Sequence, residues 1–460
     1  MKGLIRCFGS IKGVRLSWCF TARKMQCGQR RLSIKSNTVP PILSVAPIRG
    51  LVDEKFKVLV ENLPPAFPIT IYSLHQSEDQ NYWEAYGHYM SDHRGIVCVS
   101  EDMSFGGTYR GKEPMGLLWS MRPLPGSRKG LRLRKIDVEI PMLVNISVYS
   151  GHEGFREQVP LASALTERWH KAPGVRRIDL TEKGVQGTLL IPPGPGPFPG
   201  VLDIWGAGGG LLEYRAALLA SHGYAALALE NLTLTDLQTE DPKLNYFEKA
   251  FDVLKNHPQV IPDRVGVLGL SLGSIVIFYL MAESPTFKPC CCVSVSGSHS
   301  YSRDKTLKGI YKELASKFHK LRLDENNYQV WRDVGLEILK DPTNKVDVGK
   351  IECPLLLINA IDDQNWPTTE FAKHMAQMIR AAGKEHLLTI VDYPDSGHLI
   401  EPPFSPHFRA TKFIVNSSTE KAILLWGGQP KPHSDAQEDS WRKILSFLKQ
   451  HLYGSPHKML

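Results

Sequence analysis

The stretch from Val265 to Ala282 most constrains what this chain can fold into. An apolar, β-branched run predicts a buried strand, the motif Gly269-x-Ser271-x-Gly273 follows it, and a second apolar run predicts a helix packed on a sheet. Glycine on both sides of the serine allows a turn so sharp that a β-carbon there would collide with its neighbours. Such a turn lifts the serine hydroxyl to the sheet edge and aims the helix N-terminus at it. The alternative is a closely packed turn without chemistry.

Predicted strands and helices alternate from about Val175 onward, which is typical of a parallel sheet covered by helices on both faces. A polar, partly helical stretch between Ser298 and Cys353 stands where enzymes built on such sheets often insert a lid. The predicted strands span residues 187–192, 200–205, 224–229, 265–270, 290–295, 354–359 and 387–391. The predicted helices span residues 211–222, 243–257, 275–282, 368–382 and 441–452.

Short strand-like runs punctuated by proline and glycine occupy the chain from Pro47 to about Glu167 and predict a β-sandwich. These runs span residues 55–60, 69–74, 95–100, 135–140 and 142–149. No acid/base pair or ligand cluster is evident in this part. The predicted organisation is therefore a targeting segment (1–40), a β-sandwich domain (41–167) and an α/β catalytic domain (168–460) with a lid at 298–353.

A serine nucleophile needs a base, and the base needs an orienting acid. In α/β-hydrolases both follow the serine in the order acid, then histidine. Asp362 and Asp363 follow the predicted strand at 354–359, and His398 follows the one at 387–391, so all three are expected where a parallel sheet gathers its site. From the residues alone either aspartate is a candidate, and His398 is one of 16 histidines, whose default place is a surface loop.

The predicted oxyanion hole uses the backbone N–H of Leu272 and a second N–H from the loop Gly206–Gly210, assigned to Ala207. A dinucleotide fingerprint in this loop is disfavoured because Leu211 stands where the third glycine is required. The eight cysteines form no C-x-x-C pair, and no zinc-protease or phosphate-loop motif is present. We therefore expect no cofactor and no metal.

Charge is concentrated at one end of the chain. Residues 1–40 carry nine Lys and Arg side chains and no acid. Since the formal charge of the whole chain is +8, residues 41–460 carry a net charge of −1. This nearly neutral body argues against a nucleic-acid-binding surface. A basic, acid-free leader without a compact apolar core predicts a mitochondrial transit peptide, and the alternatives are the cytosol or the peroxisome. The tail Lys458-Met459-Leu460 lacks the small residue of a peroxisomal signal. No apolar run approaches the ~18 residues of a membrane span.

Four stretches resemble the family of type I acyl-CoA thioesterases and bile acid-CoA:amino acid N-acyltransferases, and the resemblance extends from about Ile48 to Leu452. These stretches are Gly106–Trp119, Gly208–Arg215, Gly397–Pro403 and Trp426–Gly428. Within this family, the chain resembles the mitochondrial acyl-CoA thioesterase branch. It implies an α/β-hydrolase domain after an N-terminal β-sandwich, with Ser271 as nucleophile, His398 as base and Asp363 as acid. Leu272-Gly273-Ser274 departs from the Lys-Gly-Gly common in thioesterase members, which leaves the acyl preference open.

The resemblance implies hydrolysis of fatty acyl-CoA to free fatty acid and CoA, with CoA leaving as a product. The family's amidating bile-acid enzyme carries cysteine as nucleophile, and a cysteinyl thioester is attacked readily by amines, whereas a seryl ester favours water. Serine at 271 therefore favours hydrolysis over an alternative N-acyltransferase activity. A second alternative is an inactive acyl-CoA-binding protein. The expected partner is a small acyl-CoA molecule, with no nucleic acid and no membrane span, and the expected state is a monomer.

Overall fold

The computed structural model describes residues 39–233, 244–302, 306–414 and 421–454. All of the helices and strands below belong to one unit, Pro40–Leu460. The predicted targeting segment and the Lys458–Leu460 tail lie outside the described residues, apart from the last two positions of the segment. Within the described ranges, no helix combines the length and apolarity needed to cross a membrane.

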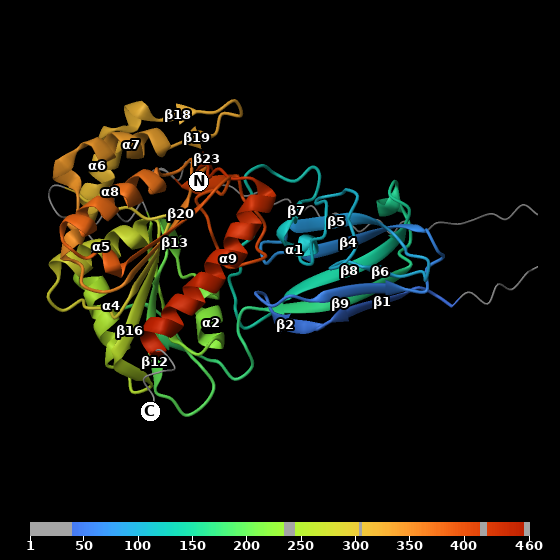
Figure 1. The fold of residues 1–460 in the computed structure, drawn as a ribbon, viewed down its shortest axis with the longest axis horizontal. Coiled ribbons are helices and arrows are strands. Elements are labelled where there is room, and N and C mark those ends of the chain that lie inside the picture. Colours follow the sequence, from blue (N-terminus) through green and yellow to red (C-terminus); the bar gives the residue numbers. More distant parts are fainter. Residues whose placement is uncertain (1–38, 234–243, 303–305, 415–420, 455–460) are drawn as a thin grey trace, which may run out of the picture. The chain divides into compact units, whose positions relative to one another are not determined.

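An eight-stranded sheet forms the centre of the second half of the chain (Figure 1). Its order is β10-β11-β14-β12-β16-β17-β20-β21; β11 runs antiparallel to both of its neighbours, β10 and β14, and all other neighbouring strands pair in parallel. Chain order reverses around β12, which pairs with β14 on one side and β16 on the other, and ligands bind at such reversals. The bounds are β10 (Arg176–Leu180), β11 (Gly187–Ile191), β12 (Phe198–Ile204), β14 (Ala225–Leu229), β16 (Val260–Leu270), β17 (Cys292–Val295), β20 (Leu355–Ala360) and β21 (Leu388–Tyr393).

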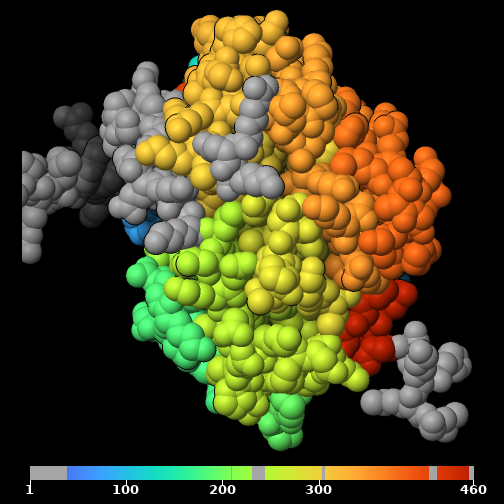
Figure 2. All heavy atoms as spheres, turned by 90° about the vertical axis from the view of Figure 1, so that its left-hand side faces the viewer, coloured from blue at the N-terminus to red at the C-terminus, as the bar shows by residue number. Residues whose placement is uncertain are grey.

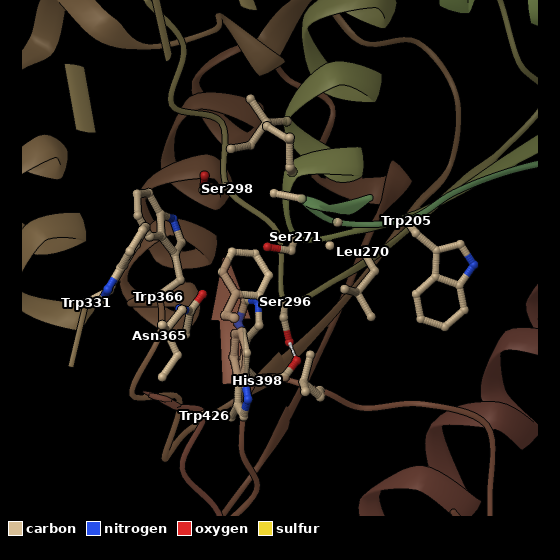
Figure 3. A pocket seen from close by; sticks show the side chains of 18 of the residues that line it. Trp205, Leu270, Ser271, Ser296, Ser298, Trp331, Asn365, Trp366, His398 and Trp426 are labelled. Carbon is tan, nitrogen blue, oxygen red and sulfur yellow. Dashed lines mark hydrogen bonds between the residues drawn. The ribbon is translucent and has the colours of Figure 1, made fainter. Parts of the chain in front are cut away.

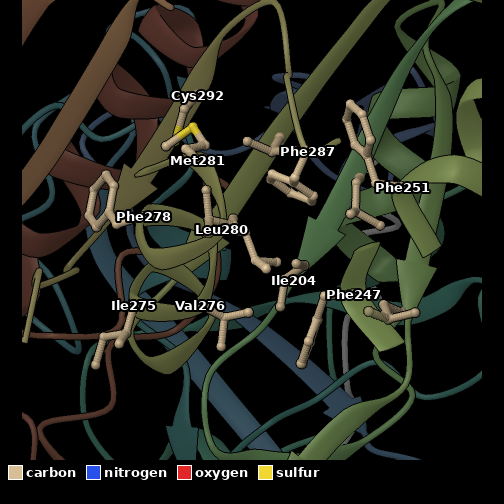
Figure 4. Packing of buried hydrophobic residues seen from close by; sticks show 14 of the residues in the cluster. Ile204, Phe247, Phe251, Ile275, Val276, Phe278, Leu280, Met281, Phe287 and Cys292 are labelled. Atoms are coloured by element: carbon tan, nitrogen blue, oxygen red, sulfur yellow. The ribbon is translucent and has the colours of Figure 1, made fainter. Parts of the chain in front are cut away.

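Helices cover both faces of this sheet because successive strand residues point to opposite faces. Val201 packs in a core shared with α2 and α9, whereas its neighbour Leu202 packs in a core shared with α4, α5 and α8. Figure 4 shows the second core, where Val276 and Leu280 of α5 lie near Phe247 of α4. The doubly wound α/β prediction is confirmed. The bounds are α2 (Tyr214–Ser221), α4 (Asn245–Lys255), α5 (Leu272–Glu283), α8 (Thr368–Ala381) and α9 (Pro430–Leu448).

The strands between Ile42 and Trp169 form the predicted β-sandwich. A three-stranded sheet, β1-β3-β6, and a six-stranded sheet, β2-β9-β8-β4-β5-β7, enclose one apolar core that includes Val58, Ile71, Trp83 and Ile146. The short helix α1 (Gly116–Trp119) adds Leu117 and Trp119 to this core. The bounds are β1 (Ile42–Ala46), β2 (Arg49–Leu51), β3 (Lys57–Glu61), β4 (Pro68–Gln76), β5 (Tyr82–Met90), β6 (Val97–Cys98), β7 (Arg122–Pro123), β8 (Met142–Ser150) and β9 (Ala162–Trp169).

The predicted strand at residues 135–140 is wrong. Residues 131–137 form an irregular segment, and two of its basic side chains have carboxylate partners: Lys135 pairs with Glu78, and Arg132 pairs with Glu401. Alternation of apolar and basic residues resembles a strand in sequence, but here it separates core-facing leucines from ion-paired cations. The predicted strand at 95–100 is reduced to the two residues of β6.

The segment between β17 and β20 contains α6 (Leu307–Ser316) and α7 (Arg332–Lys340) with the short strands β18 (Arg322–Leu323) and β19 (Gln329–Val330). Figure 2 shows this yellow-to-orange part of the chain gathered at the top of one face. β19 joins the antiparallel hairpin of β22 (Ala410–Ile414) and β23 (Lys421–Leu425), which was not predicted. The C-terminal helix α9 begins at Pro430, eleven residues before the predicted start at Trp441; its first turns carry prolines and polar residues that hide the apolar period.

Candidate active site

Ser271 is the last residue before α5, at the end of β16. Its backbone angles are φ 54° and ψ −118°, a conformation that side-chain-bearing residues rarely adopt and that persists only where the surroundings enforce it. A β-carbon on Gly273 would lie 2.4 Å from the Ile204 carbonyl oxygen, and one on Gly269 would lie 2.8 Å from the Ser274 nitrogen. Both glycines are therefore required by close backbone approach, as the motif predicted.

His398 and Asp363 lie together beneath the serine turn. His398 Nδ1 donates to Asp363 Oδ2 at 2.6 Å, and both side chains are almost fully buried. Asp363 Oδ1 accepts the backbone N–H groups of Asn365 (2.9 Å) and Trp366 (2.7 Å). These two bonds fix the carboxylate, which in turn fixes the histidine ring so that its other nitrogen is free.

Asp362, the competing aspartate, has different partners. Its Oδ2 accepts the Gly428 N–H (2.8 Å) and lies 3.6 Å from Arg409 Nη1, while its Oδ1 accepts from Gln364 Nε2 (2.7 Å). It therefore anchors the Gly427–Gly428 turn, and its carboxylate partners among the described residues do not include the His398 ring. The two neighbouring aspartates thus have different partners, and the assignment of Asp363 as the catalytic acid stays a prediction.

The His398 loop is held from both sides by His433 of α9. Gly397 N donates to His433 Nδ1 (3.1 Å), and His433 Nε2 donates to the Leu399 carbonyl (2.9 Å). Burial and the nearby His407 lower the pKa of His433 to about 3, so that the ring is neutral and can accept the Gly397 N–H. Sequence reasoning missed this histidine because 35 residues and a hairpin separate it from the loop it supports.

Two further side chains support His398 and were also missed. Trp426 stacks on the imidazole with ring centroids 5.7 Å apart, and its carbonyl accepts the His398 N–H (3.0 Å). Ser296, after β17, donates from its hydroxyl to the His398 carbonyl (2.7 Å), as Figure 3 shows. The family-like Trp426–Gly428 stretch was the available signal for the tryptophan; for Ser296 the sequence offered none.

The loop after β12 lies against the serine turn. A β-carbon on Gly206 would be 3.1 Å from Ser271 Cβ, and Gly206, Ala207 and Gly208 all line the same cavity as Ser271. Leu272 also lines this cavity, and as the first residue of α5 its N–H has no partner within the helix. The predicted pair of donors, Leu272 and Ala207, therefore lies on the two segments that flank the serine.

A cavity opens at these residues, and its wall is mainly apolar. Ser271 and His398 both line it, and Figure 3 shows no hydrogen bond between them in this structure; such contacts commonly tighten when substrate binds. The segment at 298–353 contributes α6 and α7 residues to the wall, together with Trp331. The apolar lining residues include Leu212, Leu270, Ile275, Ile310, Leu314, Ile338, Leu399, Phe413, Leu424 and Trp426. This wall suits a hydrocarbon-bearing ligand.

Buried ion pairs hold two residues of the cavity lining, Trp205 and Arg132, in place. Arg215 Nε donates to Asp203 Oδ1 (2.8 Å), and its guanidinium lies 4.1 Å from the Trp205 ring centre. Arg132 pairs with Glu401, which also accepts from Tyr214 OH (3.2 Å).

Metal binding finds no support in the part of the chain that the structure describes, where no cluster of three or more His, Cys, Asp or Glu side chains could hold an ion. The expectation of no cofactor stays a prediction.

A mostly parallel sheet wound with helices on both faces, a strained serine between strand and helix, and an aspartate-bound histidine after later strands define an α/β-hydrolase. Comparison with known families agrees. Residues 243–454 match the model described as "BAAT / Acyl-CoA thioester hydrolase C terminal", and residues 53–182 match "Acyl-CoA thioester hydrolase/BAAT N-terminal region". The chain belongs to this acyl-CoA thioester hydrolase/BAAT family.

Similar curated proteins cover nearly the whole chain. The mouse (Mus musculus) protein "Peroxisomal succinyl-coenzyme A thioesterase" is 37% identical over 427 residues, which is 90% of this chain and 97% of its own length. The mouse "Acyl-coenzyme A thioesterase 2, mitochondrial" is 33% identical over 452 residues, 95% of each chain. Among solved structures, an alpha/beta hydrolase enzyme from a deep-sea metagenome library covers 61% of this chain and 100% of its own, at 16% identity and a TM-score of 0.39.

Proposed function

We propose that this protein is a serine-dependent hydrolase of acyl-CoA thioesters that releases a free carboxylic acid and CoA. The observation that carries the proposal is the combination, in one apolar cavity, of Ser271 at its strained turn with the His398–Asp363 pair. Membership of the acyl-CoA thioester hydrolase/BAAT family adds the substrate class.

In the proposed mechanism, Ser271 Oγ attacks the thioester carbonyl while His398 Nε2 takes its proton. The N–H groups of Leu272 and Ala207 stabilise the negative oxygen that forms. Protonated His398 then gives its proton to the leaving CoA sulfur, which leaves an ester on Ser271. Water, deprotonated by the same histidine, attacks this ester, and His398 then returns the proton to Ser271 Oγ as the acid is released. Asp363 stabilises the imidazolium in both steps.

The test is release of free thiol from palmitoyl-CoA by the purified protein. We expect turnover by the unaltered chain and several orders of magnitude less by Ser271→Ala. A protein that binds palmitoyl-CoA without releasing thiol would support the acyl-CoA-binding alternative instead.

Transfer to an amino acid is the second candidate, because the matched family also includes the BAAT proteins. Serine at position 271 favours water as acceptor, since amines compete poorly for a seryl ester. Incubation of acyl-CoA with millimolar glycine or taurine should give mainly free acid. An excess of N-acyl amino acid would overturn the hydrolase proposal. If Ser271→Cys shifts products towards amide, the nucleophile itself determines the acceptor.

For location, we propose the mitochondrial matrix, on the basis of the basic, acid-free residues 1–40. Relatives with mitochondrial and peroxisomal names both occur among the similar proteins. Fractionation of the endogenous protein, with its N-terminus sequenced, should yield a matrix protein that starts after Arg31. An unprocessed chain in peroxisomes would contradict the proposal.

A further inference from the structure

A second pocket, here called the basic pocket, carries an excess of positive charge and shares no lining residue with the apolar cavity. Among the described residues that line it, five are charged apart from histidine, and four of these five are cations. Its histidine, His407, adds no charge at neutral pH because burial lowers its pKa below the ordinary value. A pocket with this charge attracts anions. Its charged lining residues are Arg122, Arg128, Lys129, Arg409 and Asp324.

The three arginines of the basic pocket keep donors for a ligand. Each side chain is about half exposed or more, and each has one carboxylate 3.6–3.7 Å away, which is beyond hydrogen-bond distance. A guanidinium has five N–H donors, and the bonds to described residues include one from Arg122 to Tyr86 OH and one from Arg409 to the Gly428 carbonyl. The carboxylates are Glu84 for Arg122, Asp79 for Arg128 and Asp362 for Arg409.

One chain segment, residues 128–134, connects the basic pocket to the apolar cavity. Gly130 lines the basic pocket and Arg132 lines the cavity. Two residues of chain span at most about 7 Å, so the two pockets are neighbours. The basic side chains of the segment are divided between them, with Arg128 and Lys129 at the basic pocket and Arg132 and Arg134 at the cavity.

The hairpin of β22 and β23 separates the two pockets. Leu424 of β23 lines the apolar cavity, whereas Leu425 lines the basic pocket, because successive strand residues point to opposite faces. Lys412 of β22 donates its backbone N–H to the Gly130 carbonyl (2.9 Å), which holds the connecting segment against the hairpin. A long ligand that reacts at Ser271 and extends along this segment therefore reaches the basic pocket.

We propose that the basic pocket binds the phosphates of the CoA nucleotide while the thioester lies at Ser271. This inference rests on the proposed thioesterase function and assigns a site to the non-reacting end of its substrate. The parts of an acyl-CoA differ as the two pockets do, since the acyl group is apolar, the nucleotide carries several negative charges, and the pantetheine arm joins them. Arginine can donate two parallel hydrogen bonds to a phosphate, and lysine adds a point charge.

The experiment compares palmitoyl-CoA with S-palmitoylpantetheine, which has the same thioester and acyl group but no nucleotide, both below their micelle-forming concentrations. The double variant Arg128→Ala/Lys129→Ala removes two exposed side chains of the basic pocket and leaves the catalytic residues in place. It should raise KM for palmitoyl-CoA about tenfold or more with little change in kcat, because only binding of a remote group is lost. KM for S-palmitoylpantetheine should change less than about twofold.

The matched control is Arg110→Ala/Lys112→Ala, which removes the same two charges at exposed positions that line neither pocket. It should leave KM for palmitoyl-CoA within about twofold of the unaltered value. Adenosine 3′,5′-bisphosphate should inhibit palmitoyl-CoA hydrolysis competitively, and its inhibition constant should rise about tenfold in the Arg128→Ala/Lys129→Ala variant alone.

An equal loss on both thioesters would overturn the inference, because it would indicate damage to the reaction site. An unchanged KM for palmitoyl-CoA, or an equal rise in the control variant, would also overturn it. If the bisphosphate lowers kcat for S-palmitoylpantetheine without competing with palmitoyl-CoA, the pocket binds a free nucleotide as an effector, and the assignment to the substrate fails.

Hydrolysis of either thioester by the unaltered protein tests the proposed function separately. If neither is hydrolysed, that function fails, and calorimetric Kd values for free CoA then decide the pocket. In that case, affinity at least tenfold weaker in the Arg128→Ala/Lys129→Ala variant and unchanged in the control variant supports the site. Equal affinities, or no binding of CoA by the unaltered protein, overturn it.

Discussion

Two groups of polar side chains line the cavity, and they differ in how completely they are paired. His398 is bound to Asp363, stacked on Trp426 and held through its loop by His433. Arg134 and Ser298, in contrast, line the cavity and carry buried polar atoms that have no partner among the described residues. The first arrangement fixes a geometry before any ligand arrives, whereas the second is completed by the ligand. Reaction chemistry and ligand choice are thus assigned to different parts of one cavity.

Removing the nucleophile should have the largest effect on turnover. Ser271→Ala should reduce acyl-CoA turnover by several orders of magnitude, because no other described hydroxyl occupies the turn between β16 and α5. The thermal unfolding midpoint should stay close to that of the unaltered protein, since Ser271 lies at the cavity and not in the core. Near-normal turnover by the pure variant would contradict the assignment.

The neighbouring residues Asp362 and Asp363 allow a matched pair of variants, in which the same substitution is made at each position. Asp363→Asn should reduce turnover by about three to four orders of magnitude, because an amide can no longer stabilise the imidazolium and favours the wrong tautomer. Asp362→Asn, next to it, should act mainly on stability through the Gly428 N–H and retain most activity. Thiol-release kinetics on both variants, with unfolding midpoints, distinguish the roles. A larger kinetic loss at Asp362 would reverse them.

Acid should lower the stability of the folded protein through His433, the histidine that supports the His398 loop. The pKa of His433 is lowered to about 3 in the folded state, against about 6.5 unfolded, so the unfolded chain binds more protons between these values. Stability is therefore fully present above about pH 6.5 and falls as pH decreases, by about 2 kcal/mol for this group between pH 7 and 5.

Buried His170 and His299, whose pKa values are also lowered to about 3 by burial, should add to the same trend. Urea unfolding at pH 7 and pH 5 measures the change. In His433→Gln the pH dependence should be shallower; an unchanged slope would show that this histidine is protonated in both states or in neither.

The smallest expected effect concerns the serine turn itself. Ser271→Gly should raise the unfolding free energy by about 1 kcal/mol, because glycine adopts a φ of 54° without the strain that a side chain causes. Ser271→Ala, which keeps the β-carbon, is the matched control and should not gain this stability. Equal midpoints for the two variants would mean that the turn stores no strain.

The sequence by itself determined the class of fold and the identity of the chemical groups. Alternating strand and helix patterns predicted the parallel sheet, and the Gly269–Gly273 motif predicted the serine turn, because both depend on short-range patterns of polarity and size. The resemblance to the acyl-CoA thioesterase family added the choice of Asp363 and the substrate class. Residues 135–140 misled the same reasoning, since periodicity does not reveal whether a cation points to water or to an ion-pair partner.

Only the tertiary structure decided which distant residues meet. Neither the pairing of His398 with Asp363 nor its support by His433 and Trp426 follows from local pattern, because each contact joins segments that only the packed sheet and the C-terminal hairpin and helix bring together. The same holds for Arg134, which comes from the irregular segment between β7 and β8 of the β-sandwich yet lines the cavity beside Gly208. Its Nε is buried without a partner among the described residues, which depends on the chain segments folded around it and not on the local sequence.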